Sequence, residues 1–191
     1  MANTPISTLT NSLKVYNPDA IYVTPFVEGD VRGTKTYKLG EVIKDSTSIA
    51  QDDPTENKIE NEFSSAPIIN NVTLGSYQFS CEVADMQKDL LIDLGGFIAG
   101  QSNTDRVHAP AKYTPKYAEV ALVFKVSDTK NVAAVLPKLQ LNTKTTFDSL
   151  SSNMGRITLA GTGLNIAVAD GAEAPIETPF YIDTNWTTAE L

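Results

Sequence analysis

The chain has 191 residues, of which 41% are hydrophobic and 20% are charged. This composition is typical of a folded domain, and the length favours a single core because domains usually take ~100–200 residues. The 23 acidic residues outnumber the 15 basic ones and give a net charge of −8. Such a surface repels the phosphate backbone, which argues against a conventional DNA-binding module.

The N-terminal segment predicts a flexible arm. Residues 1–20 are polar and end at the turn-forming trio Asn17-Pro18-Asp19, so we expect an arm over 1–20 and a single β-sandwich domain over 21–191. The segment lacks the apolar run of a signal peptide, and no stretch is long enough to insert into a membrane. The single cysteine, Cys81, excludes an intrachain disulfide. A chain without this bond suits a reducing cytoplasm and is also compatible with secretion by another route.

Short β-rich stretches separated by turn residues follow the arm. Ile21–Thr24 predicts a first strand that ends before Pro25. Residues 34–43 alternate apolar and polar side chains and predict a half-buried strand with a bulge at Gly40.

An acidic strand is predicted after Pro54. Glu56, Lys58, Glu60 and Glu62 fall on one face of an extended segment, because side chains alternate along a strand. A face of this kind must lie against solvent or a wet lumen.

The middle of the chain predicts a bent strand and then the one helix. Over residues 71–83 the apolar side chains occupy even-numbered positions before Gly75-Ser76 and odd-numbered positions after it. Because side chains alternate between the two faces of a strand, this change requires a bulge or bend. Asp85 is a candidate cap for a short helix over 86–94, and Gly95-Gly96 is a suitable stop.

The second half of the chain predicts more strands. Residues 97–114 have no clear period and predict a loop, whereas 118–126 alternate strictly and give the strongest strand signal. Residues 135–141 suit a partner strand, and Pro137 predicts that this strand lies at an edge.

Towards the C-terminus, the apolar residues change from odd-numbered to even-numbered positions across Gly161-Thr162-Gly163, which predicts a register change there. Residues 180–182 predict a last short strand. Roughly eight short strands with one helix indicate a mainly β fold, an antiparallel β-sandwich or barrel with one flanking α-helix.

Catalytic chemistry finds little support in the residue pattern. Cys81 and His108 are a nucleophile and a base in principle, but Cys81 alternates with apolar neighbours, where a cysteine is usually an inert core residue. A serine triad would need the same histidine, the only one in the chain, and the Gly-x-Ser-x-Gly turn is absent. We predict no enzyme activity and no catalytic residues.

Ligand sites find equally little support. Asp52-Asp53 and Glu56 form the densest acidic group, which favours a solvated edge over a weak calcium site. Gly161-Thr162-Gly163 lies inside a strand pattern and favours a bulge over dinucleotide binding. Trp186 suits sugar stacking or, equally, anchoring of the C-terminal end. No metal site and no cofactor is predicted.

Three stretches, taken in chain order, resemble the major tail tube proteins of long-tailed (siphovirus-like) bacteriophages. They are Lys38-Leu39-Gly40 continuing through Ser48-Ile49-Ala50-Gln51-Asp52-Asp53-Pro54-Thr55 into Ile59-Glu60-Asn61-Glu62, then Val83-Ala84-Asp85 leading into Met86 to Leu94, and finally Pro137-Lys138-Leu139, Thr146-Phe147-Asp148 and Gly155 to Leu164. They are similar to that family's paired strands, short helix and closing strands.

The resemblance implies a virion protein whose copies close into hexameric rings that stack into a tail tube. Such a tube encloses the tape measure protein, meets tail-end or baseplate proteins, and later conducts DNA to the host without specific contacts. An acidic lumen suits this role because like charge keeps DNA from adhering. We therefore place Glu56, Glu60 and Glu62 in or near the lumen.

Two other functions fit the same fold. Another virion β-protein, such as a capsid decoration or head-tail joining subunit, would form rings or trimers that do not stack. A carbohydrate- or cell-surface-binding module would stay monomeric and display clustered aromatics, whereas the aromatics here make up 8% of the chain and mostly alternate into predicted core faces.

Overall fold

The computed structural model describes residues 17–61, 64–84, 86–103, 105–112, 114–128, 130–147, 155–169 and 171–187. The fold is mainly β with antiparallel sheets, and one short helix is present in these ranges. The predicted fold class is therefore confirmed. The predicted arm falls mostly on 1–16, outside the described residues, but its boundary at residue 20 is wrong, because Ala20 already pairs in the first strand and is buried.

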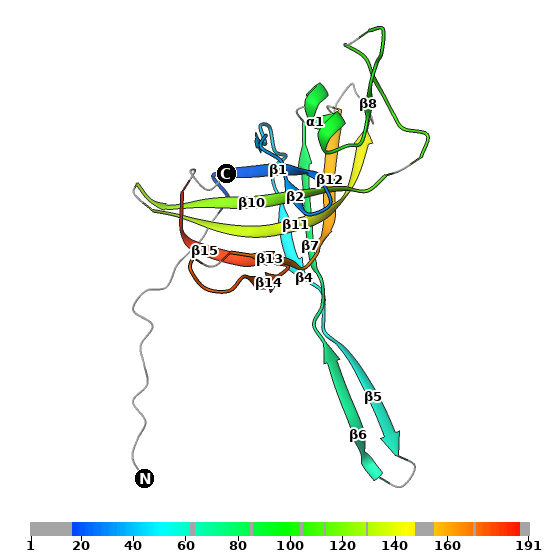
Figure 1. Cartoon of the computed structure of the whole chain (residues 1–191), viewed down its shortest axis with the longest axis vertical. Coiled ribbons are helices and arrows are strands. Elements are labelled where there is room, and N and C mark those ends of the chain that lie inside the picture. The colour runs from blue at the N-terminus through cyan, green and yellow to red at the C-terminus, as the bar shows by residue number, and fades with distance from the viewer. Residues whose placement is uncertain are drawn as a thin grey trace.

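A nine-stranded sheet forms the body of the molecule (Figure 1). Its main order is β2-β1-β10-β11-β12-β7-β4, with β15 added to β11 and β3 added to β1. The strands are β1 (Ala20–Glu28), β2 (Val31–Arg32), β3 (Tyr37–Lys38), β4 (Ser48–Gln51), β7 (Tyr77–Val83), β10 (Lys116–Ser127), β11 (Lys130–Thr146), β12 (Arg156–Gly163) and β15 (Tyr181–Trp186).

Three two-stranded ribbons accompany this sheet. They pair β5 (Thr55–Asn61) with β6 (Ser64–Thr73), β8 (Ile98–Ala99) with β9 (Val107–His108), and β13 (Ile166–Val168) with β14 (Ile176–Thr178). Figure 1 shows that the β5–β6 hairpin projects far from the body along the long axis, while the loop carrying β8 lies at the opposite end. The loop predicted over 97–114 is thus largely correct, apart from its two short strands.

The helix α1 (Lys88–Asp93) begins two residues later than predicted. Its N-cap is Gln87, which makes no side-chain capping bond, and the predicted cap Asp85 lies outside the described residues. Leu90, Leu91 and Leu94 are buried, so packing on the sheet supports this short helix. The helix stops where predicted, since Gly96 adopts a φ of 70° that favours glycine.

Residues 37–43 join the two ends of the sheet. Tyr37–Lys38 pairs with β1, and Leu39 N–H donates to the Ile21 carbonyl at 2.8 Å. A few residues later Val42 bridges to Val83 of β7. The prediction of one continuous strand over 34–43 is therefore wrong: the chain turns after Gly40, where Val42 N–H donates to the Gly40 carbonyl at 2.7 Å, and changes its partner strand.

The larger core lies on one face of the sheet. It combines apolar side chains of β1, β7, β10, β11 and β12 with those of α1: Ile21, Val23, Leu39, Phe79, Cys81, Val83, Leu90, Leu91, Leu94, Ala118, Val120, Leu122, Leu136, Leu139, Leu141, Ile157 and Leu159. The alternation over 118–126 places successive side chains on opposite faces of the sheet. Val120 and Leu122 enter this core, while Ala121 and Val123 face the other side.

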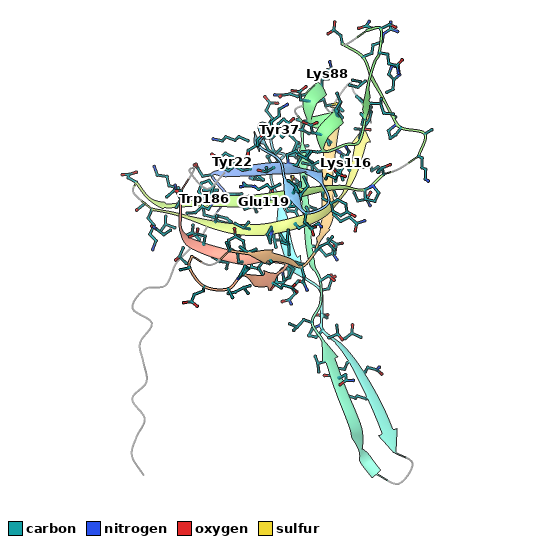
Figure 2. All side chains as sticks on the ribbon, in the orientation of Figure 1. Tyr22, Tyr37, Lys88, Lys116, Glu119 and Trp186 are labelled. Atoms are coloured by element: carbon teal, nitrogen blue, oxygen red, sulfur yellow. The ribbon has the colours of Figure 1, made fainter. Side chains whose placement is uncertain are left out.

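A smaller core covers the opposite face. It consists of Ala20, Ala121, Val123, Ala133, Val135 and Trp186. The Trp186 ring lies 5.5 Å from the Tyr22 ring between centroids, and Figure 2 labels both. Trp186 therefore anchors the C-terminal strand to the body, which is one of its two predicted roles.

Two prolines occupy positions that the sequence pattern does not predict. Pro25 does not end β1, which continues to Glu28, with Pro25 opposite Ala118 of β10. Proline lacks an amide donor but keeps its acceptor, and the Pro25 carbonyl accepts from Gly33 N–H at 2.8 Å.

Pro137 lies in the central strand β11, so its predicted edge position is wrong. The β10 pairing shifts register between the pairs Ala118–Leu139 and Val120–Leu136. On the other side, β15 pairs with residues 131–135 of β11 and β12 pairs with residues 139–146. Pro137 therefore lies at a bulge and in the gap between two partner strands, where a ladder donor is not required.

Both predicted register flips are breaks between strands. The first lies at residues 74–76, between β6 and β7, where the chain passes from the hairpin into the main sheet. The second lies at residues 164–165, just after the predicted glycine pair, since β12 continues through Gly163. The predicted final strand at 180–182 is β15, which extends to Trp186.

Candidate assembly surfaces

The β5–β6 hairpin is a bare two-stranded ribbon. Its strands pair with each other, from Thr55 opposite Thr73 to Ile59 opposite Ile69, and with no other described strand. Residues 55–58 and 71–74 are exposed on both faces of the ribbon. The exposed fractions of Val72 and Leu74 are 56% and 76%, so apolar side chains stand in solvent near the hairpin base.

The base of the hairpin is held in a defined direction. Asp52 N–H donates to the Ser76 carbonyl at 2.9 Å, and Gln78 Nε2 donates to Asp52 Oδ2 at 2.8 Å. Gly75 lies so close to Asp52 that a Cβ at Gly75 would be 1.8 Å from the Asp52 carbonyl oxygen. The two chain segments that enter and leave the hairpin therefore cross in contact, which only glycine permits.

The predicted acidic strand is β5. Glu56 is exposed and its Oε2 lies 2.5 Å from Lys58 Nζ, which agrees with the two side chains sharing one face. Glu60 belongs to the same strand, and Glu62 lies outside the described residues. The strand β6 that completes the hairpin is a feature that the sequence reasoning missed, although the apolar pair Ile68-Ile69 between two turn-type residues was a signal for it.

The loop at the other end of the molecule is basic. Residues 97–116 include Arg106, Lys112 and Lys116 against a single acid, Asp105. Hydrogen bonds within the loop shape it: Gly100 N–H donates to the Arg106 carbonyl at 2.9 Å, and Asp105 N–H donates to Asn103 Oδ1 at 3.0 Å. The side chains of Arg106 and Lys112 are exposed.

An open groove runs between the β13–β14 ribbon and β15. Its volume is about 650 Å³, and it is lined by residues that include Val168, Ile176, Tyr181 and Ile182. The exposed fractions of Ile176 and Ile182 are 55% and 59%. The groove therefore presents apolar side chains beside a strand at the margin of the sheet.

The strand β4 ends the main sheet and pairs only with β7 within the described ranges. Ser48, Ala50 and Gln51 are exposed along it. An open edge of this kind offers unpaired backbone donors and acceptors to a strand from another chain.

The structure separates the candidate nucleophile from the candidate base. Cys81 is fully buried in the larger core, and burial raises the pKa of its thiol to about 12. His108, in contrast, is exposed on β9. A neutral, buried thiol suits packing and not nucleophilic attack.

Two of the three candidate calcium ligands are engaged elsewhere: Asp52 accepts from Gln78, and Glu56 pairs with Lys58. Across the described residues, no group of three or more His, Cys, Asp or Glu side chains could hold a metal ion. A helix of the length and apolarity needed to cross a membrane is also not found in that part of the chain.

Charged contacts fix the helix to the body. Lys35 Nζ lies 2.7 Å from Asp89 Oδ2, and the Tyr37 hydroxyl donates to Asp93 Oδ2. Burial, followed by the bond to Asp93, raises the pKa of Tyr37. The hydrogen bond from Lys35 lowers the pKa of Asp89. These bonds connect α1 to β3 and to the segment before it.

No family model matches the chain, and no curated protein matches it either.

Proposed function

We propose that this chain is a structural subunit that assembles with copies of itself, as the tail tube protein of a long-tailed bacteriophage. The observation that carries the proposal is the β5–β6 hairpin, which extends from the body (Figure 1) and whose residues 55–58 and 71–74 are exposed. A two-stranded hairpin is marginally stable alone in water, because it buries little apolar surface. Contact with a neighbouring copy would supply the missing cover.

Open strand edges support lateral association. The outer edge of β4 is unpaired within the described ranges, and short strands β2 and β3 flank β1 at the other end of the main sheet. A head-to-tail contact between two different surfaces generates a closed ring when its rotation closes. In the proposed assembly, hexameric rings form in this way and stack into the tube.

The charge of the chain suits a conduit for DNA. With a net charge of −8, a channel lined by this protein would repel the DNA backbone and allow it to pass without specific contacts. A lumen-facing role for Glu56, Glu60 and Glu62 stays a prediction. Its test is reversal of Glu56 to lysine in a reconstituted particle, where slower genome ejection supports the role and unchanged ejection contradicts it.

The proposal places the protein in the virion tail, after synthesis in the host cytoplasm. The tape measure protein would lie inside the tube and tail-end or baseplate proteins at its tip. The proposed function involves no catalytic step and no cofactor, because the assembled tube acts only as a conduit for DNA.

Removal of the hairpin tests the proposal directly. In one variant, residues 55–73 are replaced by a short Gly/Ser turn between β4 and β7. We expect this variant to keep the thermal unfolding of the body and to lose higher-order assembly in sedimentation velocity. A matched control, Lys130→Glu, changes an exposed charge at the β10–β11 turn and leaves the hairpin intact. Assembly of the hairpin-deleted protein at wild-type concentration would overturn the proposal.

A further inference from the structure

The strand β15 has a free edge among the described strands. One side of β15 pairs with residues 131–135 of β11, and no described strand pairs with its other side. The groove beside it is lined by the consecutive residues 181–184 of β15 together with Ile176 and Thr178 of β14. Because successive side chains of a strand point to opposite faces, a groove lined by consecutive residues runs along the edge of the strand. Such a groove fits an extended chain that adds to β15 as a further strand.

The groove combines exposed apolar side chains with negative charge. Ile176 is 55% exposed, and the charged residue among those that line the groove is Asp183, whose Oδ1 accepts from Asn185 N–H at 2.7 Å. The described residues 164–169 and 171–187 carry no basic side chain and three acidic ones, Glu173, Glu177 and Asp183. None of these three carboxylates forms a salt bridge with a described residue. The groove therefore favours a chain that is apolar on one face and carries positive charge.

The residues before β1 have this pattern. In the segment 8–15, apolar side chains occupy the odd-numbered positions of Leu9, Leu13 and Val15, and every even-numbered position is polar. In an extended chain this order places the apolar side chains on one face and the polar ones on the other. Lys14 is the one charged side chain among residues 1–18. The segment thus matches the groove in both apolar pattern and charge.

The start of β1 lies within reach of the groove. Ala20 lies opposite Val123 of β10, Val123 lies opposite Ala133 of β11, and Ala133 lies opposite Asp183 of β15. Ala20 and Asp183 are therefore level with each other across the sheet, about 14 Å apart over three strand spacings. Lys14 precedes Ala20 by six residues, and an extended chain of that length spans about 20 Å.

We propose that residues 8–15, the N-terminal strap, dock in the groove of their own chain as a strand on the free edge of β15, with Lys14 beside Asp183. The strap covers an edge that is otherwise open to strands from other chains. Its ion pair lies at the protein surface, so the docking weakens with added salt. This inference is independent of the proposed self-assembly, since both ends of the contact belong to one chain.

Backbone hydrogen exchange in the full-length protein tests the docking. Mass spectrometry follows the amides of residues 8–15, and a synthetic peptide of residues 1–16 supplies their unprotected rate. One variant alters the strap by Leu13→Asp with Val15→Asp, and another alters the groove by Ile176→Asp. The matched control is Val31→Asp, which changes a valine that is 64% exposed on β2, outside the groove. Samples are compared at two protein concentrations, both below the onset of light scattering by assemblies.

We expect the strap amides in the wild-type protein to exchange roughly tenfold more slowly than those of the peptide, since strand pairing protects backbone amides. The strap and groove variants lose this protection, whereas Val31→Asp keeps it. Asp183→Asn retains a side-chain oxygen for Asn185 N–H and should lower the protection by about two- to fivefold, as expected for a surface ion pair.

Three results would overturn the inference. Exchange of the wild-type strap at the rate of the peptide would show a free arm, and protection that survives Ile176→Asp would place the strap elsewhere. Protection that rises with protein concentration would assign the groove to the strap of another copy. Each of these results leaves the proposed function to its own test, the removal of the β5–β6 hairpin.

Discussion

The indole of Trp186 lies against the ring of Tyr22, with the two centroids 5.5 Å apart, so the last strand of the described chain is joined to the first. Trp186 is 5% exposed and completes the smaller core over Ala121, Val123, Ala133 and Val135. Tyr22 and Tyr181 pack against the same core, so Trp186 and these two tyrosines together cover this face of the sheet.

Truncation of the Trp186 side chain should lower the stability of the fold. We expect Trp186→Ala to lower the free energy of unfolding by about 3 kcal/mol, because it leaves a cavity over the smaller core. Ile182→Ala, on the same strand but 59% exposed, is the control and should change the free energy by less than about 0.5 kcal/mol. Urea denaturation measures both values. Equal effects of the two substitutions would show that Trp186 does not cover the sheet.

The Tyr37–Asp93 bond predicts a loss of stability in alkali. The pKa of Tyr37 is raised above its usual value of 10.0, so the native state holds the phenolic proton more tightly than the unfolded state does. Stability from this group is present below the unfolded pKa and is lost as pH rises through the higher folded pKa. Tyr37→Phe removes this alkaline dependence and costs about 1 kcal/mol at neutral pH through loss of the hydrogen bond.

Chemical denaturation at about pH 8 and about pH 11 measures this difference between the two proteins, because the window lies above the ordinary tyrosine pKa. Parallel alkaline losses in wild type and Tyr37→Phe would assign the pH dependence to other groups.

The thiol of Cys81 should resist modification in the folded protein. Its pKa is raised to about 12 by burial, so the reactive thiolate is scarce near neutral pH, and the core also blocks access. We expect no labelling by a disulfide reagent until the protein unfolds, and one labelled thiol per chain afterwards. Rapid labelling of the folded protein would contradict the position of Cys81 in the larger core.

The hairpin base predicts a specific role for Gly75. A methyl group at this position overlaps the Asp52 carbonyl oxygen at 1.8 Å, so Gly75→Ala must push apart the two segments that enter and leave the hairpin. We expect a loss of about 1–3 kcal/mol in stability and assembly only at higher concentration. The neighbouring change Ser76→Ala, at an exposed side chain, should leave both nearly unchanged. Thermal unfolding with light scattering distinguishes the two variants.

The parts of the fold that follow from local pattern were predicted well. The alternation over 118–126 identifies β10, because apolar residues at every second position indicate a strand without knowledge of its partners. The Gly95-Gly96 stop of the helix is correct for a similar reason, since the left-handed φ of Gly96 is a local requirement.

The parts of the fold that depend on partners distant in the sequence were not predicted. Pro137 indicated an edge, but the gap between β12 and β15 that accommodates it is set by strands far away in the sequence. The hairpin was missed because its second strand, β6, pairs only with β5 among the described strands, so its extent is set by that pairing and not by a hydrophobic pattern of its own.

Negative-stain electron microscopy of the purified wild-type protein at rising concentration, with light scattering on the same samples, tests the central claim most directly. We predict rings and then hollow tubes as the concentration increases, because the hairpin and the open edges each gain a partner. A monodisperse monomer at every concentration would contradict self-assembly and favour a monomeric binding module with the same fold.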